Sequence, residues 1–189
     1  PLLVNDLPNH LFWTSPWPRD EHHFDDVATL CDHVVVDSRT FEQPVRDLAL
    51  LDARRKNGAR ITDLNWLRLR PWRRALAEGF ERVTWRPGTK TSATISHGKS
   101  ASAASHLLAK WIGEKLAADV RLGVVAAAND TLCPGGVDVL AGDCQVQLEA
   151  NGNHIAVHVT TPEYCYLPLK VPESRGRDGD LLAAAIDLG

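Results

Sequence analysis

Residues 98–100 read Gly-Lys-Ser, the tripeptide that closes a phosphate-binding loop, and they lie between a predicted strand and a predicted helix. That loop also needs a glycine five residues before Gly98, where backbone amides curl around a phosphate. Ala93 occupies this position inside the predicted strand, so the full motif is missing. Lys99 and Ser100 still predict a weak anion site at the helix N-terminus, although the simpler prediction is that Ser100 caps the helix.

The histidines do not have the spacing of a metal centre. His22 and His23 are adjacent and cannot face one point from a helix. His154 and His158 share one face of a predicted strand, where four residues span about 13 Å, too far for one ion. The chain also has no GxSxG motif and no Cys-His signature of a nucleophile. We therefore predict no metal site, no bound cofactor and no catalytic residue.

The four cysteines include three candidates for a redox switch, Cys133, Cys144 and Cys165. With Cys31 they form no CxxC pair, which argues against zinc, and in a reducing cytoplasm they are expected to be free thiols. Proline and glycine after Cys133 predict an exposed loop. Because a disulfide needs Cα atoms within roughly 7 Å, Cys133 can reach Cys144 only if that loop curls back.

Tryptophan and arginine are concentrated between residues 65 and 85, and this segment is the candidate partner-binding site. Both residue types are enriched at protein–protein hot spots. Two alternatives stay open: the tryptophans could be core anchors, or the segment could stack on and contact a nucleic acid. The partner-binding candidates are Asn65, Trp66, Arg68, Arg70, Trp72 and Arg73.

The first part of the chain alternates apolar runs with helical periodicity, which predicts a parallel or mixed sheet covered by helices. Strands are predicted at residues 2–4 and 33–37, with helices at 24–31 and about 40–56. Ligands of such sheets bind at the carboxyl ends of the strands. The rival function is therefore a small-molecule-binding or enzymatic domain. Its candidate ligand residues are Asp6, Asp37, Ser38 and Arg39.

The residues that follow predict a different secondary-structure pattern from that of the first part. Asp63 is a suitable cap for a helix that Pro71 either kinks or breaks into two pieces. Beyond it we predict an α+β part with antiparallel hairpins and one long helix at 101–117, ending in a short final helix. The Asn151-Gly152 pair predicts a type I′ hairpin. The strands are predicted at 83–86, 91–97, 124–127, 137–140, 144–148 and 154–159.

Two domains follow from this pattern, an α/β unit over residues 1–81 and an α+β domain over 82–189. The start at Pro1 without any methionine predicts that the first domain continues upstream. A formal net charge of -3 gives no overall attraction to nucleic acid or to anionic lipid. No apolar run approaches the roughly 20 residues of a membrane span. We predict a cytoplasmic protein that binds neither nucleic acid nor membrane.

Several short blocks resemble one known family, the glucose-6-phosphate dehydrogenase assembly protein OpcA family. The most specific block resembles the family's DLNW and LTPWR signature, with Arg70 in place of the usual threonine. Other blocks resemble LLV.DLP followed by LWW, ADRVIVDS and the LLAGWL helix. These blocks lie at residues 63–73, 2–13, 31–38 and 107–112.

The resemblance implies an accessory protein without catalysis of its own. It implies that the chain binds, assembles and activates glucose-6-phosphate dehydrogenase in the oxidative pentose phosphate pathway. In photosynthetic members it also implies redox control by thioredoxin, although Cys133 and Cys144 match no defined motif of the family.

Overall fold

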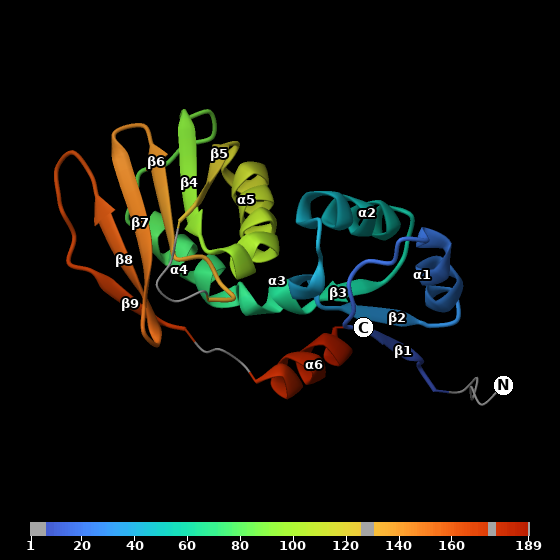
Figure 1. The fold of residues 1–189 in the computed structure, drawn as a ribbon. Coiled ribbons are helices and arrows are strands. Elements are labelled where there is room, and N and C mark those ends of the chain that lie inside the picture. Colours follow the sequence, from blue (N-terminus) through green and yellow to red (C-terminus); the bar gives the residue numbers. More distant parts are fainter. Residues whose placement is uncertain (1–6, 126–130, 174–176, 189) are drawn as a thin grey trace. The chain divides into compact units, whose positions relative to one another are not determined.

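The computed structural model describes residues 7–125, 131–173 and 177–188, and the chain forms two compact units (Figure 1). Unit 1 consists of residues 1–68 and 176–189, and unit 2 consists of residues 69–175. Within the described residues, unit 1 holds a three-stranded sheet and unit 2 a six-stranded sheet.

Unit 1 is built on a parallel sheet in the order β1-β2-β3. Because parallel neighbours need a crossover, a helix follows each of the first two strands. The prediction of a parallel sheet with helices in the first part is confirmed. The elements are β1 (His10–Trp13), α1 (Glu21–Ala28), β2 (His33–Val36), the 3₁₀ helix η1 (Ser38–Thr40), α2 (Pro44–Lys56) and β3 (Ile61–Asp63).

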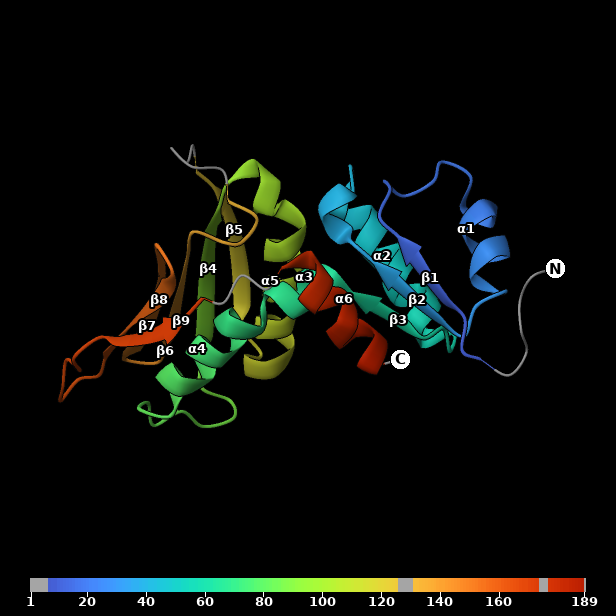
Figure 2. The ribbon, with the colours of Figure 1, turned by 90° about the horizontal axis from the view of Figure 1, so that it is seen from below.

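The central strand β2 is buried along its whole length. Such burial suits its run of three valines, because a strand covered on both faces has no polar side. Val35 packs with Leu64 and with Leu181 and Ala185 of α6 (Asp178–Asp187). Figures 1 and 2 show α6 on the opposite face of this sheet from α1 and α2.

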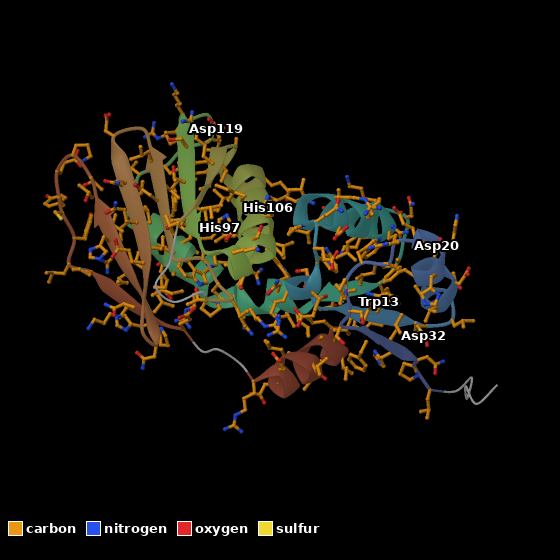
Figure 3. All side chains as sticks on the ribbon, in the orientation of Figure 1. Trp13, Asp20, Asp32, His97, His106 and Asp119 are labelled. Atoms are coloured by element: carbon orange, nitrogen blue, oxygen red, sulfur yellow. The ribbon has the colours of Figure 1, made fainter. Side chains whose placement is uncertain are left out.

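Aromatic side chains fill the space beneath α1. The Phe24 ring lies 4.7 Å from the ring of Trp17 and 5.3 Å from that of Trp13, measured between centroids. At the start of α1, the Asp20 carboxylate caps the helix by accepting a hydrogen bond of 3.1 Å from the His22 backbone N–H (Figure 3). Trp17 and Phe24 are therefore core anchors of unit 1.

The helical segment around Pro71 has two pieces, the second of the two predicted alternatives. Helix α3 (Leu64–Arg68) closes unit 1, and α4 (Arg70–Phe80) begins unit 2 with Pro71 in its first turn. Proline is tolerated there because the first backbone N–H groups of a helix have no intrahelical acceptor.

Unit 2 carries a mixed sheet in the order β5-β4-β6-β7-β8-β9. Only β4 and β5 run parallel among these neighbours, and the others are antiparallel. The predicted α+β part with antiparallel hairpins and one long helix is confirmed. The strands are β4 (Thr91–His97), β5 (Asp119–Val124), β6 (Gly136–Ala141), β7 (Cys144–Asn151), β8 (His154–Thr160) and β9 (Leu169–Pro172).

Helices α4 and α5 (Ser102–Leu116) pack on this sheet, α5 against β4 and β5 and α4 against β7 and β8 (Figures 1 and 2). Burial alternates along β4, which shows that one face meets the helices. At Gly79 an added Cβ would lie 2.6 Å from Val146 Cγ1, so the close approach of α4 to the sheet requires glycine.

Several predicted elements differ from the structure. The predicted strand at residues 2–4 and the candidate ligand residue Asp6 lie outside the described residues. No strand forms at residues 83–86, because the following strand β4 already pairs with β5 and β6 on its two edges. A strand was predicted at 124–127, but the observed strand β5 covers Asp119–Val124 and overlaps that range only at Val124. Residues 126 and 127 of the predicted range lie outside the described part. β1, β3 and β9 were not predicted from the sequence.

One predicted turn and one predicted helix cap also differ from the structure. The β7–β8 hairpin forms where predicted, but Asn151 pairs with His154, so Gly152 and Asn153 make the turn. Gly152 has a φ of 64°, and among described residues Ala117 is the sole non-glycine with positive φ. The turn is therefore not type I′, which needs positive φ at both central residues. Ser100 lies inside the 3₁₀ helix η2 (Lys99–Ala101) and does not cap α5.

The units divide the chain at a different place from the predicted boundary after residue 81. Helix α4 belongs to unit 2 because its apolar face packs on β7 and β8. Residues 176–189 return to unit 1 because α6 packs on β2 and α3. Among the described residues, no helix is long and apolar enough to cross a membrane.

Candidate functional site

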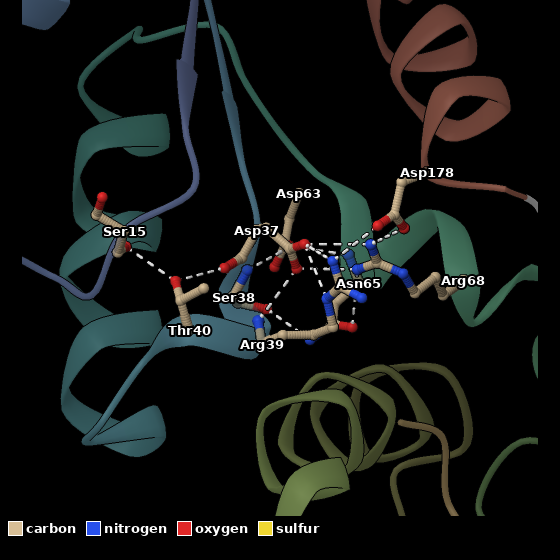
Figure 4. A network of polar contacts seen from close by, with 9 residues as sticks. All are labelled: Ser15, Asp37, Ser38, Arg39, Thr40, Asp63, Asn65, Arg68 and Asp178. Atoms are coloured by element: carbon tan, nitrogen blue, oxygen red, sulfur yellow. Dashed lines mark hydrogen bonds and ion pairs between the residues drawn. The ribbon is translucent and has the colours of Figure 1, made fainter. Parts of the chain in front are cut away.

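Polar side chains meet at the carboxyl ends of β2 and β3 in unit 1 (Figure 4). The strands are parallel and in register, with Val36 opposite Asp63, so the residues that follow them lie at the same edge of the sheet. Asp37, Ser38 and Arg39 come from the β2 end, and Asn65 and Arg68 come from α3. The structure thus brings together three predicted ligand residues and two predicted partner-binding residues. We call this group, with Asp63 and Asp178, the strand-end cluster.

Asp63 is the buried centre of this cluster, with a relative exposure of 1%. Its Oδ1 accepts hydrogen bonds from the backbone N–H groups of Asn65 at 2.9 Å and Ser38 at 3.2 Å. The predicted capping role of Asp63 is thereby confirmed. Burial raises the pKa of Asp63, against the hydrogen bonds from Ser38 and Asn65, which lower it. The Asn65 side-chain amide also donates to Ser38 Oγ at 3.0 Å, which ties η1 to α3.

Asp37 is held by two arginines. Arg68 donates from Nη1 to Oδ1 at 2.9 Å and from Nη2 to Oδ2 at 3.1 Å, in the parallel fork that guanidinium and carboxylate favour. Arg39 Nε donates to Oδ2 at 2.8 Å. Burial, the largest single effect, raises the pKa of Asp37, but the combined hydrogen bonds and charges of Arg39 and Arg68 hold that pKa below its usual value.

Asp178 completes the cluster from the first turn of α6. Its Oδ1 accepts from Arg68 Nη2 at 2.9 Å and its Oδ2 from Arg39 Nη2 at 3.2 Å. The hydrogen bond from Arg68 is the main reason that the pKa of Asp178 lies below its usual value. The sequence predicts Asp63 only as a helix cap and not as a site residue. It does not predict Asp178 either, because nothing in the sequence pairs residues 68 and 178.

The cluster can recognise an anion or hold the fold together, since it presents guanidinium groups and carboxylates. Arg68 is nearly buried, with 8% of its side chain exposed, and its forked ion pair with Asp37 faces inward. This arginine therefore stabilises unit 1, and its side chain is not the exposed contact that the composition predicted.

The other predicted partner-binding residues have different environments. Trp72 is fully buried and Asn65 nearly so, which removes both side chains from the exposed surface. Trp66 and Arg73 are half-buried, and Arg70 is exposed. Burial, with the nearby charge of Arg70, lowers the pKa of Arg73. The burial of Trp72 agrees with the alternative that this tryptophan is a core anchor, and the side chain of Asn65 binds Ser38 inside unit 1.

None of the three candidate redox cysteines forms a disulfide bond. Cys133 is buried and precedes β6, at the end where Gly136 pairs with Glu149, whereas Cys144 pairs with Ala141 at the other end. The length of β6 therefore separates Gly136, three residues after Cys133, from Cys144 by roughly 17 Å. Cys165 is exposed and bridges Thr160, two strand spacings from β7, which places it roughly 10 Å from Cys144. The span of β6 and the separation of Cys165 from Cys144 both exceed the reach of a disulfide.

A direct prediction follows for the oxidised protein. Mild oxidation with diamide is expected to modify Cys165, the exposed thiol, and to give no crosslink between Cys133 and Cys144. Peptide mapping by mass spectrometry under non-reducing conditions checks this result. A Cys133–Cys144 crosslink in protein that keeps its native circular dichroism spectrum would show that this part of unit 2 rearranges.

The described residues of each unit also line a hollow. A cavity of about 730 Å³ lies between α1, β2 and α2, and its lining includes Phe24, Asp25, Cys31 and Arg54. Arg54 pairs with Asp25 at 2.6 Å, so the charged groups at this cavity already have partners. A hollow of about 470 Å³ on unit 2 lies over β4, β6 and β7, where Thr94, Asp138 and Gln147 line it.

The histidines form one close pair, His10 and His33 on neighbouring strands, with their Nδ1 atoms 3.2 Å apart. Burial is the main cause that lowers the pKa of His33. In the described part of the chain no three histidine, cysteine or acidic side chains group as ligands for a metal ion.

Comparison with protein families gives two adjoining matches. A family model described as the C-terminal domain of the glucose-6-phosphate dehydrogenase subunit matches residues 59–187. A second model, described as the N-terminal domain of the same protein, matches residues 1–53.

Two relatives carry the name OxPP cycle protein OpcA. The protein from Nostoc punctiforme is 31% identical over 117 residues, which are 61% of this chain and 25% of the relative. The protein from Synechocystis is 28% identical over the same length, with the same coverage of each chain. The match with this chain thus spans about a quarter of the length of these curated relatives.

Solved structures show likeness of fold alone. Crystal structures of a 3-ketoreductase from Actinomadura kijaniata, in complex with NADP and TDP-benzene, match with a TM-score of 0.57. The sequence identity is 9–10%, and the match covers 97–98% of this chain and 69–71% of the reductase. The fold is therefore shared with a reductase, and the activity does not follow from that likeness.

Proposed function

We propose that this chain, which belongs to the OpcA family of glucose-6-phosphate dehydrogenase subunits, binds glucose-6-phosphate dehydrogenase and promotes its assembly and activity without catalysing a reaction itself. The observation that carries the proposal is the match of both domain models of this family, over residues 1–53 and 59–187. The family name indicates an association with this enzyme, and activation is the further step that we propose. The protein would act in the cytoplasm, as the sequence predicts.

The exposed start of α4 is the part of the predicted interface that the structure leaves at the surface. Arg70 is exposed there, whereas Trp72 two residues later anchors the helix on the sheet. Because the buried tryptophan fixes the backbone of α4, a partner that binds Arg70 needs to order only its side chain, which favours a hot-spot role. We therefore assign the partner contact to Arg70, with Arg73 beside it.

The test measures binding of purified glucose-6-phosphate dehydrogenase to the full-length protein and to two matched variants. Arg70→Ala is expected to weaken binding by about 1–2 kcal/mol, or roughly five- to thirtyfold in Kd. The control is Arg74→Ala on the same helix, whose side chain is 70% exposed and pairs with Glu78. This variant removes the same charge and should bind as the wild type does.

Failure of the wild-type protein to co-purify with the enzyme would contradict the proposed function. Equal loss in both variants would indicate a general charge effect and would remove Arg70 from the interface.

Thioredoxin is a further proposed partner. Cys165 supports this proposal because its thiol is exposed and open to mixed-disulfide formation. Glucose-6-phosphate dehydrogenase activation measured before and after oxidation of the protein, and again after reduction by thioredoxin, tests it. An equal level of activation in all three states would argue against redox control and would leave the assembly role in place.

A further inference from the structure

The strand-end cluster contains a carboxylate held between two guanidinium groups. Arg68 Nη2 donates to one oxygen of Asp178 at 2.9 Å, and Arg39 Nη2 donates to the other at 3.2 Å. The two arginines come from different elements, η1 and α3, and converge on one exposed anion (Figure 4). This arrangement is an anion-binding site whose occupant is a side chain of the same protein.

The two arginines do not need Asp178 to keep their positions. Asp37, with 3% of its side chain exposed, binds Arg68 through both of its oxygens and binds Arg39 through Oδ2. Asn65 Oδ1 accepts a further bond of 3.3 Å from Arg68 Nη1. The guanidinium groups are therefore preorganised from the buried side, and such preorganisation reduces the cost of binding an external anion.

Asp178 is the member of the cluster best placed to leave. Its side chain is 60% exposed, against 26% for Arg39 and 8% for Arg68. No side-chain hydrogen bond caps the start of α6. The apolar contacts of α6 begin at its fourth residue, where the side chains of Leu181 and then Ala185 pack on Val35 and Leu64. Residues 178–180 can therefore move while the helix from Leu181 onward stays in place.

Charge and geometry select the ligand. Without Asp178, two guanidinium groups face one buried carboxylate, which leaves one net positive charge. An external carboxylate gains nothing over Asp178, because the internal group has the higher effective concentration. A phosphate group can compete, since it carries more charge and offers oxygens to the Nη2 atoms of both guanidinium groups.

We propose that Arg39 and Arg68 form a phosphate-binding site that Asp178 occupies in the unliganded protein, and that phosphate binding displaces Asp178 and loosens the first turn of α6. The ligand class is inorganic phosphate or the phosphate group of a small monoester. The site lies at the carboxyl ends of parallel strands, where ligands of α/β sheets bind. This inference is independent of the proposed role toward glucose-6-phosphate dehydrogenase.

The experiment titrates inorganic phosphate, and separately β-glycerophosphate, into the full-length protein at constant ionic strength and follows binding by calorimetry. Asp178→Asn is expected to bind phosphate about tenfold more tightly than wild type, which corresponds to removing a competing interaction of about 1.4 kcal/mol. Asp180→Asn is the matched control, because Asp180 lies in the same first turn of α6. Arg39→Gln should abolish the gain when combined with Asp178→Asn.

Hydrogen exchange gives a second readout in the wild-type protein. Saturating phosphate should speed exchange of the Asp180 and Leu181 amides, whose N–H groups donate to the Arg177 carbonyl oxygen, and leave β2 unchanged. Absence of saturable phosphate binding to Asp178→Asn, or an equal gain in Asp180→Asn, would overturn the proposal. Tighter binding of β-glycerophosphate than of inorganic phosphate would identify a monoester ligand, and the reverse order would identify the free ion, each within the proposed class.

Discussion

Replacing Asp37 with alanine is expected to lower the free energy of unfolding of unit 1 by about 3 kcal/mol, near the lower end of the range for breaking a buried ion pair. The change removes the buried carboxylate that faces both Arg39 and Arg68. Arg68 would then keep its charge with 8% of its side chain exposed. Its remaining partners, Asp178 and Asn65, limit the loss. Hydrogen-exchange protection of β2 and α3 measures the effect.

Asp178→Ala is the matched control for this prediction. It removes a carboxylate that binds the same arginines, but that side chain is 60% exposed. Its loss should cost under about 1 kcal/mol. Equal destabilisation by the two changes would show that burial does not set the strength of the cluster.

The pH dependence of the Asp37 effect has a defined sign. The folded-state pKa of Asp37 lies below its ordinary value, so the carboxylate stabilises the folded state above the unfolded pKa of about 3.9. That contribution is lost as the pH falls through the lower folded pKa. The stability difference between wild type and Asp37→Ala should therefore be full at neutral pH and shrink in strong acid. Asp63 has the opposite sign, because its folded-state pKa is raised.

Replacing Trp72 with alanine is expected to destabilise unit 2 by about 3–5 kcal/mol, the range for deleting a large buried aromatic side chain. Trp72 has a relative exposure of 0% and lies on the buried face of α4 with Ala75, Leu76 and Gly79. Loss of the indole leaves a cavity between the helix and the sheet. Chemical denaturation monitored by hydrogen exchange in residues 69–175 measures the change.

Arg70→Ala is the control for the Trp72 prediction, because it changes an exposed residue of the same helix. This variant should keep wild-type stability within about 0.5 kcal/mol. If Trp72→Ala bound glucose-6-phosphate dehydrogenase weakly while unit 2 kept its full stability, the tryptophan would be an interface residue after all.

The elements that the sequence predicts best are those fixed by local patterning. The three successive valines of β2 predict a strand that is buried on both faces, and the alternation in β4 predicts a strand with one buried face. The burial of the two strands in the structure agrees with both patterns. β3 was missed because it has three residues, too few for any period. β1 was missed because His10 and Trp13 frame only two aliphatic or aromatic residues and do not read as a buried run.

The candidate site was only partly predictable for a different reason. The positions of Asp37, Ser38 and Arg39 follow from the end of a predicted strand. The role of Arg68 does not, because its partner Asp178 lies 110 residues away in the sequence. Composition marks arginine and tryptophan as candidate contacts, but it cannot tell a contact with another protein from one within the chain. Trp72 and Arg68 both proved to be internal in this way.

The central claim, that the protein activates glucose-6-phosphate dehydrogenase, is tested most directly by titrating the full-length protein into the purified enzyme and measuring its activity. We predict a saturable rise in activity, with the half-maximal concentration increased at least fivefold for Arg70→Ala and unchanged for Arg74→Ala. Enzyme activity that stays constant at every concentration of the correctly folded wild-type protein would contradict the account.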